Sequence, residues 1–338
     1  MPIRLGYKWD EIMKKCFFAR SNETELWFNL ALEAYLLSTA AVEQNLLYLW
    51  QNDRCVVIGR YQNPWAECCI ENLCRDNVML GRRPSGGGAV YQDMGNGCFT
   101  FACPKDQYDK DENFGIVADS LENLKIRCQR SGRNDIMVND RKVSGSAFQF
   151  GQRFASYHAT MLVSASLSKV GDYLTPNQTK LQSKGVKSVA SRIANLEEFS
   201  PGITVSDFYD SLWHSYSRKY GDAVKVREFS KADMDSIPEL AELYGKFSSA
   251  QWIYGKSPEF TDRVEGRIGM GCVSFCLNVV KGCIVSASVY SDTLECGVVE
   301  KLEKLLVGCL YERQRIQSLS AGQEGLVEEA LEFLSAGI

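Results

Sequence analysis

Several common functional signatures are missing from this 338-residue sequence. It has only two histidines, His158 and His214, and none of its thirteen cysteines falls in a C-x-x-C pair, so a zinc site is not expected. It has no G-x-x-x-x-G-K-[ST] motif, which removes the usual P-loop route to nucleotide binding. Gly266, Gly269 and Gly271 follow the order G-x-x-G-x-G without a surrounding βαβ pattern, so a dinucleotide fingerprint is excluded.

The sequence also lacks the marks of membrane and secreted proteins. No apolar run approaches the roughly 18 residues that a membrane helix needs. Residues 1–15 are mildly basic but include Asp10 and Glu11 and have no apolar core, so neither a secretory signal nor a transit peptide is expected. The scattered cysteines are typical of reduced, mostly buried thiols in an intracellular protein. The expected compartment is the cytoplasm or the mitochondrion.

Composition and charge are those of an ordinary folded protein. Apolar residues make up 45% of the chain and charged residues 24%, and the length suffices for one large and one smaller domain. The formal net charge of −4 argues against a nucleic-acid partner.

Alternating strand and helix patterns predict an α+β fold for residues 1–248. We expect a buried helix at 26–37, capped by Asn22 or Thr24, and a hairpin formed by 46–50 and 55–60. The other elements expected in this domain are a helix beginning near Pro64, strands at 78–83, 98–103 and 154–164, a helix at 113–129, a hairpin of 136–138 with 141–147, an amphipathic helix at 205–220, and a mobile loop at 175–187.

Residues 249–338 are expected to form a second, smaller α+β domain. Two strands at 272–280 and 283–290 are joined by the turn Lys281-Gly282, and helices are expected at 298–310 and 325–334.

The stretch from Arg82 to Asp93 joins two arginines to three consecutive glycines, Gly86-Gly87-Gly88. Glycine reaches positive φ and allows close approach to a ligand. Successive N–H groups in such a turn can converge on anionic oxygens, and guanidinium groups add forked donors. Strand-like sequence on both sides, at 78–80 and 89–91, favours a binding site over the alternative, a flexible surface turn.

Basic residues gather beside Gly- and Ser-rich turns, which indicates a site for a polyanion or a carboxylate. Lys142 is followed by Ser144-Gly145-Ser146, small residues that leave space beside its ammonium group. A solvated strand lysine is the alternative. His158 either points at the same site or is a satisfied core residue. The basic clusters are Arg82-Arg83, Arg133 with Arg141-Lys142, and Lys184 and Lys187 with Arg192.

Several motifs occur in an order that resembles one known family, lipoate–protein ligase A, in its bacterial-type two-domain form. The resemblance runs from about residue 15 to near the C-terminus. It implies the biotin/lipoate-ligase fold for the large domain, with mixed sheets and flanking helices, and an accessory domain at 249–338. The motifs are Arg82-Arg83-x-Ser-Gly-Gly-Gly-Ala-Val-Tyr, Gly95-Asn96-x-Cys-Phe-Thr-Phe, Gly132-Arg133-Asn134-Asp135, Lys142-Val143-Ser144-Gly145-Ser146-Ala147, Gly59-Arg60-x-Gln62-Asn63-Pro64-Trp65, Lys184-Gly185-x-x-Ser188-Val189-x-Ser191-Arg192 and the segment from Trp252 to Phe260.

The reaction that this resemblance implies has two halves. Lipoate attacks the α-phosphorus of MgATP to give lipoyl-AMP and pyrophosphate, and a lysine of an acceptor domain then attacks the mixed anhydride. Lys142 is implied as the catalytic residue, an electrostatic stabiliser between the lipoate carboxyl group and the α-phosphate. Asp135 is implied as a magnesium contact. Lys184 and Arg192 are implied to belong to a lid over the adenylate.

The resemblance also implies two sets of binding residues and a set of partners. The partners are lipoyl-acceptor domains of 2-oxoacid dehydrogenase complexes and the glycine cleavage H protein, with lipoate or octanoate as the small-molecule substrate. No nucleic acid and no membrane partner is expected, and the chain is expected to be a monomer. The implied ATP-binding residues are Arg83, Gly88, Ala89, Val90, Tyr91, Asp135 and Lys142, and the implied lipoate-binding residues are Ser85, Gly86, Gly87, Lys142 and His158.

One position departs from the family pattern. The family usually has Val-aromatic-His-Asp after the glycines, whereas this chain has Gln92, which forms hydrogen bonds but carries no proton charge. Three alternatives therefore stay open: a lipoyltransferase that uses preformed lipoyl-AMP, a transferase that takes octanoyl from a carrier protein, and a non-catalytic lipoyl-binding protein. The Gly-Gly-Gly loop and the lack of a suitably placed cysteine argue against the carrier-dependent enzyme.

Overall fold

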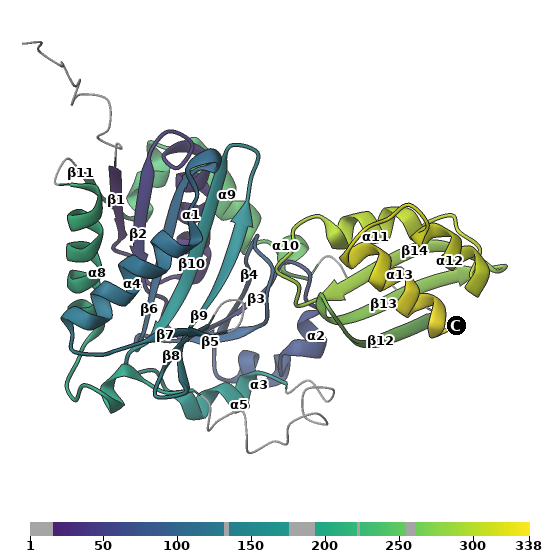
Figure 1. The fold of residues 1–338 in the computed structure, drawn as a ribbon, viewed down its shortest axis with the longest axis horizontal. Coiled ribbons are helices and arrows are strands. Elements are labelled where there is room, and N and C mark those ends of the chain that lie inside the picture. The colour runs from purple at the N-terminus through teal and green to yellow at the C-terminus, as the bar shows by residue number, and fades with distance from the viewer. Residues whose placement is uncertain (1–15, 132–134, 176–192, 222–223, 255–260) are drawn as a thin grey trace, which may run out of the picture.

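The computed structural model describes residues 16–131, 135–175, 193–221, 224–254 and 261–338. The chain forms a large and a small α+β domain that lie next to each other (Figure 1), which confirms the predicted fold class. Within these ranges, no helix combines the length and apolar character needed to cross a membrane.

The large domain is built on an eight-stranded sheet in the order β11-β1-β2-β6-β10-β9-β8-β7. β1 pairs in parallel with both β11 and β2, and the remaining neighbours are antiparallel. The sheet is therefore mixed, with parallel pairing at the β11-β1-β2 end and antiparallel pairing in the rest. Its strands are β1 (Cys16–Ser21), β2 (Asn45–Trp50), β6 (Asn96–Pro104), β7 (Gln129–Ser131), β8 (Asp135–Val138), β9 (Arg141–Phe150), β10 (Phe154–Leu162) and β11 (Val224–Phe229).

Helices cover both faces of this sheet. Because side chains alternate along a strand, Leu46, Tyr48 and Trp50 of β2 pack on one face, while Leu47 and Leu49 pack on the other. α1 and α9 build the core on the first face, and α4 and α8 build it on the second. The covering helices are α1 (Leu26–Thr39), α4 (Lys110–Asn123), α8 (Val205–Tyr220) and α9 (Pro238–Ser248).

Three of the helix predictions can be compared with these bounds. The predictions for α1 and α8 are confirmed, but the α1 N-cap is Glu25 and makes no side-chain cap, so the predicted Asn22 or Thr24 cap is wrong. α4 begins and ends earlier than the predicted 113–129, because Asp109 caps its first turn and β7 begins at Gln129.

A second sheet of the large domain, in the order β4-β3-β5, holds the glycine loop. The predicted hairpin of 46–50 with 55–60 is wrong, since β2 belongs to the large sheet whereas β3 pairs in parallel with β4 and antiparallel with β5. Every residue of β2 and β3 is buried, so each strand needs cover on both faces, and 51–54 carry the chain between sheets. These strands are β3 (Cys55–Ile58), β4 (Met79–Arg82) and β5 (Val90–Gln92).

Short helices complete the large domain around the second sheet. Asn63 caps α2 through the backbone N–H of Trp65, with Pro64 in the first turn as predicted. The short helices and 3-10 turns are α2 (Pro64–Glu67), α3 (Ile70–Arg75), η2 (Lys105–Gln107), η3 (Leu167–Lys169), α5 (Val170–Tyr173), η4 (Leu196–Glu198), η5 (Lys231–Asp235) and α10 (Ala250–Tyr254).

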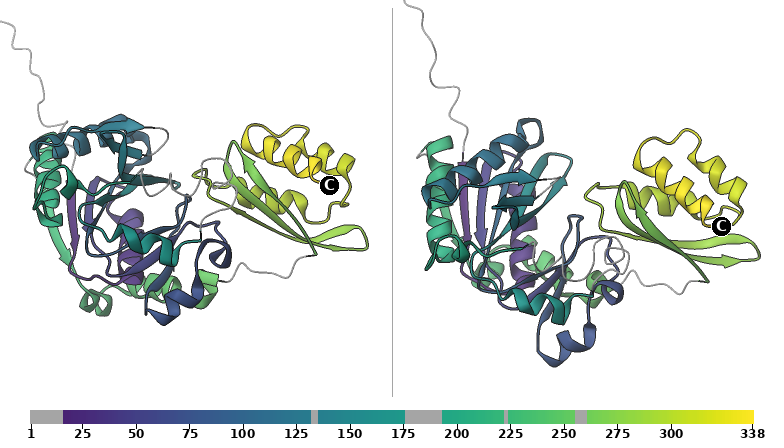
Figure 2. Two further views of the ribbon diagram at one scale, coloured as in Figure 1. Left: turned by 90° about the horizontal axis from the view of Figure 1, so that it is seen from below. Right: turned by 60° about the horizontal axis from the view of Figure 1, so that its bottom comes forward.

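The small domain is a three-stranded antiparallel sheet, β12-β13-β14, with helices packed on one face. The predicted β13–β14 hairpin is confirmed, and its turn places Lys281 and Gly282 at φ 52° and 75°. β12 and α12 were not predicted. Figure 2 shows the β12–β13 end of this sheet directed at the large domain. The elements are β12 (Asp262–Ile268), β13 (Gly271–Val280), β14 (Cys283–Ser291), α11 (Val298–Leu306), α12 (Arg313–Ser320) and α13 (Leu326–Ala336).

Candidate active site

Arg83 holds the glycine loop from inside. Its guanidinium group donates four hydrogen bonds to carbonyl oxygens: two to Gly86, one to Gly88 and one to Val57, at 2.7–3.2 Å. Burial lowers the pKa of Arg83 to about 10, and Glu33 partly opposes that effect. Gly87 lies at φ 94°, a conformation that side chains rarely adopt, so the loop needs glycine there. A buried cation thus fixes the shape of the loop.

Arg82, the preceding residue, forms hydrogen bonds with residues 59–62 and with α10 instead of with the glycine loop. Its Nη1 donates to the carbonyl oxygens of Gly59, Arg60 and Gln62, and its Nε and Nη2 donate to Ile253 of α10. Burial lowers its pKa to about 10. Arg82 is therefore a structural cation that fixes the 59–62 turn beside the glycine loop.

Lys142 stands on β9, next to β8 in the antiparallel part of the large sheet. Its Nζ lies 2.7 Å from Oδ1 of Asp135, and both side chains are about one-third exposed. A Cβ at Gly145 would come within 3.0 Å of Nζ, so this glycine provides the space beside the ammonium that the sequence predicts. The turn of this hairpin is tight, with Asn139 and Asp140 both at positive φ, and the predicted hairpin is confirmed.

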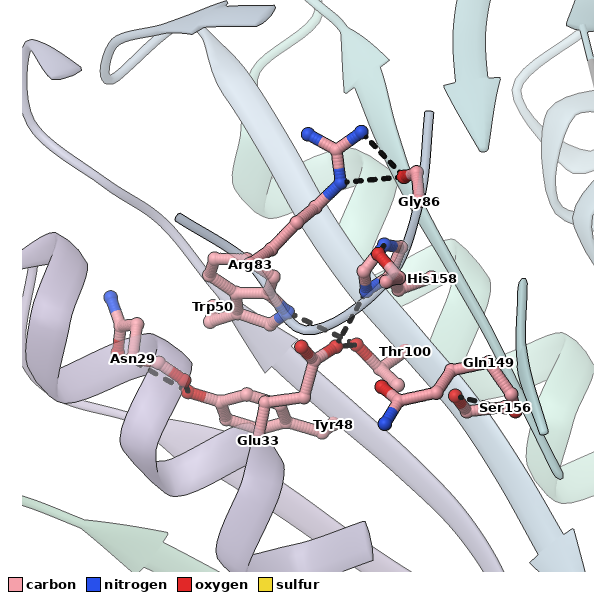
Figure 3. Close-up of polar contacts among 11 residues, drawn as sticks. Asn29, Glu33, Tyr48, Trp50, Arg83, Gly86, Thr100, Gln149, Ser156 and His158 are labelled. Carbon is pink, nitrogen blue, oxygen red and sulfur yellow. Dashed lines mark hydrogen bonds and ion pairs between the residues drawn. The ribbon is translucent and has the colours of Figure 1, made fainter. Parts of the chain in front are cut away.

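A chain of buried polar side chains extends from the glycine loop into the core (Figure 3). His158 joins Ser85 through Nε2 at 2.9 Å and Glu33 through Nδ1 at 3.0 Å. Thr100 donates to the same carboxylate oxygen of Glu33 at 2.6 Å, and Trp50 donates to Thr100 at 3.3 Å. A carboxylate can only accept, so Nδ1 of His158 carries the proton in this contact.

The network keeps Glu33 ionised although it is buried. Burial raises the pKa of Glu33, but His158, Thr100 and Arg83 outweigh that effect and hold this pKa below its ordinary value of 4.5. A buried carboxylate without such partners would be neutralised by its surroundings. Glu33 therefore supplies a fixed negative charge that orients His158.

A cavity of about 710 Å³ opens between these groups. Arg83, Gly87, Gly88, Lys142 and His158 line one part, so the cavity brings together the loop, the ammonium and the imidazole. Leu30, Trp50 and Val57, which belong to one core cluster, form an apolar recess in its lining, and Ala147 lines the cavity as well.

Gln92 also lines the cavity, and its amide is held in one orientation. Asn52 donates through Nδ2 to Oε1 of Gln92 at 2.8 Å, and the Cys55 thiol lies 3.9 Å from the same oxygen. With its oxygen occupied, the part of Gln92 that remains for the cavity is its NH₂ group.

The small domain closes the other side of the cavity. Arg267 lies near the end of β12, Met270 in the β12–β13 turn, and Asp292 and Leu294 just after β14, and all four line the space. These residues are absent from the sequence-based prediction because the glycine pattern around Arg267 and Met270 has the wrong order for a dinucleotide fingerprint.

Hydrogen bonds attach the small domain beside the glycine loop. The N–H of Gly87 donates to the carbonyl of Thr293 at 2.9 Å, and the N–H of Ser291 donates to Tyr61 at 2.9 Å. Glu300 accepts from both Arg60 Nε and Tyr61 Oη at 3.1 Å. The side chain of Tyr61 is 3% exposed and packs into the small domain's own core. The loop and the small domain are thus positioned together.

The residues predicted from the sequence take up different places around the cavity. Ala89 and Val90 line it, whereas Tyr91 points to the opposite side of β5, where it stacks on Tyr173 at 5.4 Å. Ser85 and Asp135 reach the cavity only through His158 and Lys142. Gly86 packs against Thr293, and the predicted lid residues Lys184 and Arg192 fall outside the described residues.

Sequence reasoning missed Glu33 and Trp50. Glu33 is the single acidic residue within the apolar stretch 26–37, and a lone carboxylate on a buried helix is the signal that points to it. Trp50 ends a strand of apolar residues and carries no comparable signal.

Comparison with known proteins assigns the two domains to described families. The sequence model of the lipoyl protein ligase A/B catalytic domain matches residues 25–217, and that of the bacterial lipoate protein ligase C-terminus matches 257–324. The large domain and its cavity therefore define a protein of the lipoyl ligase class. With both domains matched, the chain belongs to the lipoate–protein ligase A family, as the sequence motifs predict.

Individual relatives agree with this assignment. The chain is 41% identical over 304 residues to lipoate-protein ligase A of Psychrobacter cryohalolentis, across 88% of this chain and 90% of the relative. The structure of P. falciparum LipL1 in complex with lipoate matches with a TM-score of 0.82 at 29% identity, covering 95% of this chain and 98% of that one. A bi-partite lipoate protein ligase of Thermoplasma acidophilum matches with a TM-score of 0.62 at 25% identity, covering 74% and 100%.

Proposed function

We propose that this chain is an ATP-dependent lipoate–protein ligase, which activates lipoate to lipoyl-AMP and transfers the lipoyl group to a protein lysine. One observation carries the proposal. A single cavity holds Lys142, the Arg83-braced glycine loop and an apolar recess. Adenylation of a fatty acid analogue requires these three features side by side, because a carboxylate on an apolar chain must meet a phosphate.

The apolar recess suits the hydrocarbon chain and dithiolane ring of lipoate. Leu30, Val57 and Ala147 provide apolar surface, and Trp50 adds a large aromatic face. Octanoate has the same carboxylate and a similar chain, so we expect the recess to accept it as well. His158 lines the cavity as part of the Glu33 network and is the polar group that we assign to lipoate orientation.

The polar part of the cavity suits the reacting groups. A carboxylate oxygen of lipoate attacks the α-phosphorus, and the bond from that phosphorus to the bridging oxygen of pyrophosphate breaks. Two anions have to approach each other, so a fixed ammonium between them lowers the barrier by electrostatic preorganisation. We assign that role to Lys142, and its ion pair with Asp135 at the cavity supports the assignment. Gly88 and Ala89 line the same space, and backbone N–H groups of such a loop can bind phosphate oxygens.

Asp135 is the residue that we assign to magnesium. Magnesium prefers one or two carboxylates together with phosphate oxygens and water, and within the described residues no group of three or more ligands competes for it. One oxygen of the Asp135 carboxylate lies on Lys142, and we assign the ion to the other. Bound magnesium would neutralise charge on the triphosphate as pyrophosphate departs.

The acceptor protein and the compartment are proposed from the relatives and the sequence rather than from the cavity. The Thermoplasma acidophilum ligase is described together with its E2 lipoyl domain, which supports lipoyl domains of 2-oxoacid dehydrogenase complexes as acceptors here. The glycine cleavage H protein is a further proposed acceptor. We place the reaction in the cytoplasm, with the mitochondrion as the other predicted compartment, and propose a monomer.

Pyrophosphate release tests the proposal directly. Purified protein with lipoate and MgATP should release pyrophosphate, and it should then modify a separately added lipoyl domain. Transfer from synthetic lipoyl-AMP without pyrophosphate release would select the adenylate-dependent lipoyltransferase. If neither activity is found while lipoate still binds, the chain is a lipoyl-binding protein and the proposal is wrong.

A further inference from the structure

The cations expected to bind the nucleotide already have partners in this structure. Arg83 uses four of its N–H groups on loop carbonyl oxygens, and a guanidinium group has five. Lys142 is paired with Asp135 at 2.7 Å. Arg83 thus shapes the loop, and Lys142 serves the α-phosphate. Among the described residues of the large domain, no other cationic side chain lines the cavity to meet the outer phosphates of a triphosphate.

Arg267 of the small domain is a third cation at the same cavity. It lies near the end of β12, on the opposite side of the strand from Val264 and Ile268, whose side chains pack against the small domain's core. The Arg267 side chain is exposed, and across the described ranges it forms no hydrogen bond or ion pair. A solvent-facing guanidinium at the rim of an anion site is available to a ligand.

The neighbouring arginine on β12 is in a different situation. Arg263 lies on the same side of the strand, but its Nη2 pairs with Glu265 at 2.5 Å and its Nε donates to Ser274 at 3.1 Å. Arg263 does not line the 710 Å³ cavity. The two arginines therefore share a strand and a face but differ in partners and in access to the cavity.

The position of Arg267 relative to the glycine loop is fixed by the domain contacts. Gly87 bonds to Thr293, which follows the end of β14, and Tyr61 is embedded in the small domain's core. Cys272, at the start of β13, donates to the Asp292 carboxylate at 2.7 Å, so the end of the sheet that carries Arg267 is tied to the Thr293 segment. The same contacts that attach the domain set the distance from Arg267 to the loop.

We propose that Arg267 binds the β- and γ-phosphates of ATP during lipoate activation, so that the small domain completes the nucleotide site. This inference rests on the proposed ligase function. When the carboxylate oxygen bonds to the α-phosphorus, the electron pair of the breaking bond goes to the bridging oxygen of pyrophosphate, and no proton moves. Negative charge grows on the leaving group, and a guanidinium group, which donates two parallel hydrogen bonds to phosphate oxygens, stabilises it.

The test compares Arg267→Gln with Arg263→Gln. We expect Arg267→Gln to lower kcat/KM for ATP in pyrophosphate release by roughly 10- to 100-fold, the usual effect of losing a hydrogen bond to a charged group. KM for lipoate and the rate of transfer from synthetic lipoyl-AMP should stay as in the wild type, because neither involves the outer phosphates. Arg267→Lys should restore part of the activity, and Arg263→Gln should behave as wild type.

Direct binding separates a ligand contact from a structural effect. Arg267→Gln should weaken binding of a non-hydrolysable ATP analogue while leaving the affinity for AMP unchanged. Equal losses for the ATP analogue and AMP, or an equal loss in the transfer step, would show that Arg267 acts through domain placement and would overturn the proposal. Wild-type rates in the variant would also overturn it. Absence of pyrophosphate release in the wild-type protein would instead refute the proposed ligase function itself.

Discussion

The backbone N–H of Gly87 donates a hydrogen bond to the carbonyl oxygen of Thr293 in the other domain. Beside it, Gly86 has no room for a side chain, since a Cβ there would lie 1.9 Å from the same Thr293 oxygen. The glycine triplet therefore has two separate reasons to lack side chains. Gly87 needs its positive φ and Gly86 needs contact with the small domain, whereas a Cβ at Gly88 would meet no atom within 4 Å.

The Gly86–Thr293 contact predicts the effect of a single methyl group. Gly86→Ala should push the small domain off the loop, and overpacking of this kind costs about 1–3 kcal/mol. We expect pyrophosphate release to fall by roughly 5- to 150-fold, the range that corresponds to that energy. Gly115→Ala is the matched control, because a Cβ in the middle of α4 meets no atom within 4 Å. Equal rates in the two variants would contradict the contact.

Removal of the Lys142 ammonium should abolish activation but spare the fold. Lys142→Ala is expected to reduce pyrophosphate release by at least about 100-fold, the typical effect of removing a preorganised charge-stabilising donor. The thermal midpoint should hardly change, because an ion pair that is about one-third exposed contributes less than about 1 kcal/mol. Arg218→Gln, which breaks the exposed pair between Arg218 on α8 and Asp119 on α4, is the control for stability and activity. A Lys142→Ala enzyme with full adenylation would remove this residue from the mechanism.

Gln92 predicts a simple pH response. Its amide does not titrate, so the wild-type rate of pyrophosphate release should have no acidic limb that originates at this position. Gln92→His introduces an imidazole whose ordinary pKa is about 6.5. We expect the pH profile of the variant to separate from that of the wild type below about pH 7. Superimposable profiles would mean that position 92 does not face the reacting groups.

Glu33 predicts a pH dependence of stability with a definite sign. Its pKa in the folded protein is lower than the ordinary 4.5, so the stability it provides is present above pH 4.5 and is lost as the pH falls through the folded value. Glu33→Gln should lower the free energy of unfolding at pH 7 by about 2 kcal/mol, since charge-assisted hydrogen bonds to His158 and Thr100 are lost. Urea titrations of both proteins should converge towards acidic pH. A constant gap across pH would contradict the shifted carboxylate.

Local patterns predicted the elements whose partners lie nearby in the sequence. α8 matches the expected bounds because its apolar stripe and the Thr204 cap both act locally. The β8–β9 hairpin follows from Asn139-Asp140, a pair that tolerates positive φ. The predicted hairpin of residues 46–60 was wrong because the true partners of its strands are distant in the sequence. Residues 51–54 look like a hairpin turn, but the strands on either side are buried in different sheets, and only long-range pairing decides that.

The site residues also fall into two groups, those with a local sequence signal and those brought together by long-range packing. Lys142 and the glycine loop carry local signals, namely small residues beside a cation and a run of glycines. Glu33 and Thr100 meet His158 only because α1, β6 and β10 pack together, and their separations in the sequence exceed 50 residues. Arg267 lies on a strand with charged residues at alternate positions, a pattern that resembles any solvent-facing edge.

Tyr61 belongs to the large domain by sequence but to the small domain by packing. A fragment that begins near residue 249 would keep the three strands and three helices of the small domain but would lack Tyr61. The resulting cavity in its core would lower the free energy of unfolding by about 3–5 kcal/mol. Such a fragment should not be an autonomous folding unit. If the two domains were produced as separate polypeptides, the large domain would bind the small one through the Tyr61 ring. The stability of the small domain would then rise with the concentration of the large domain.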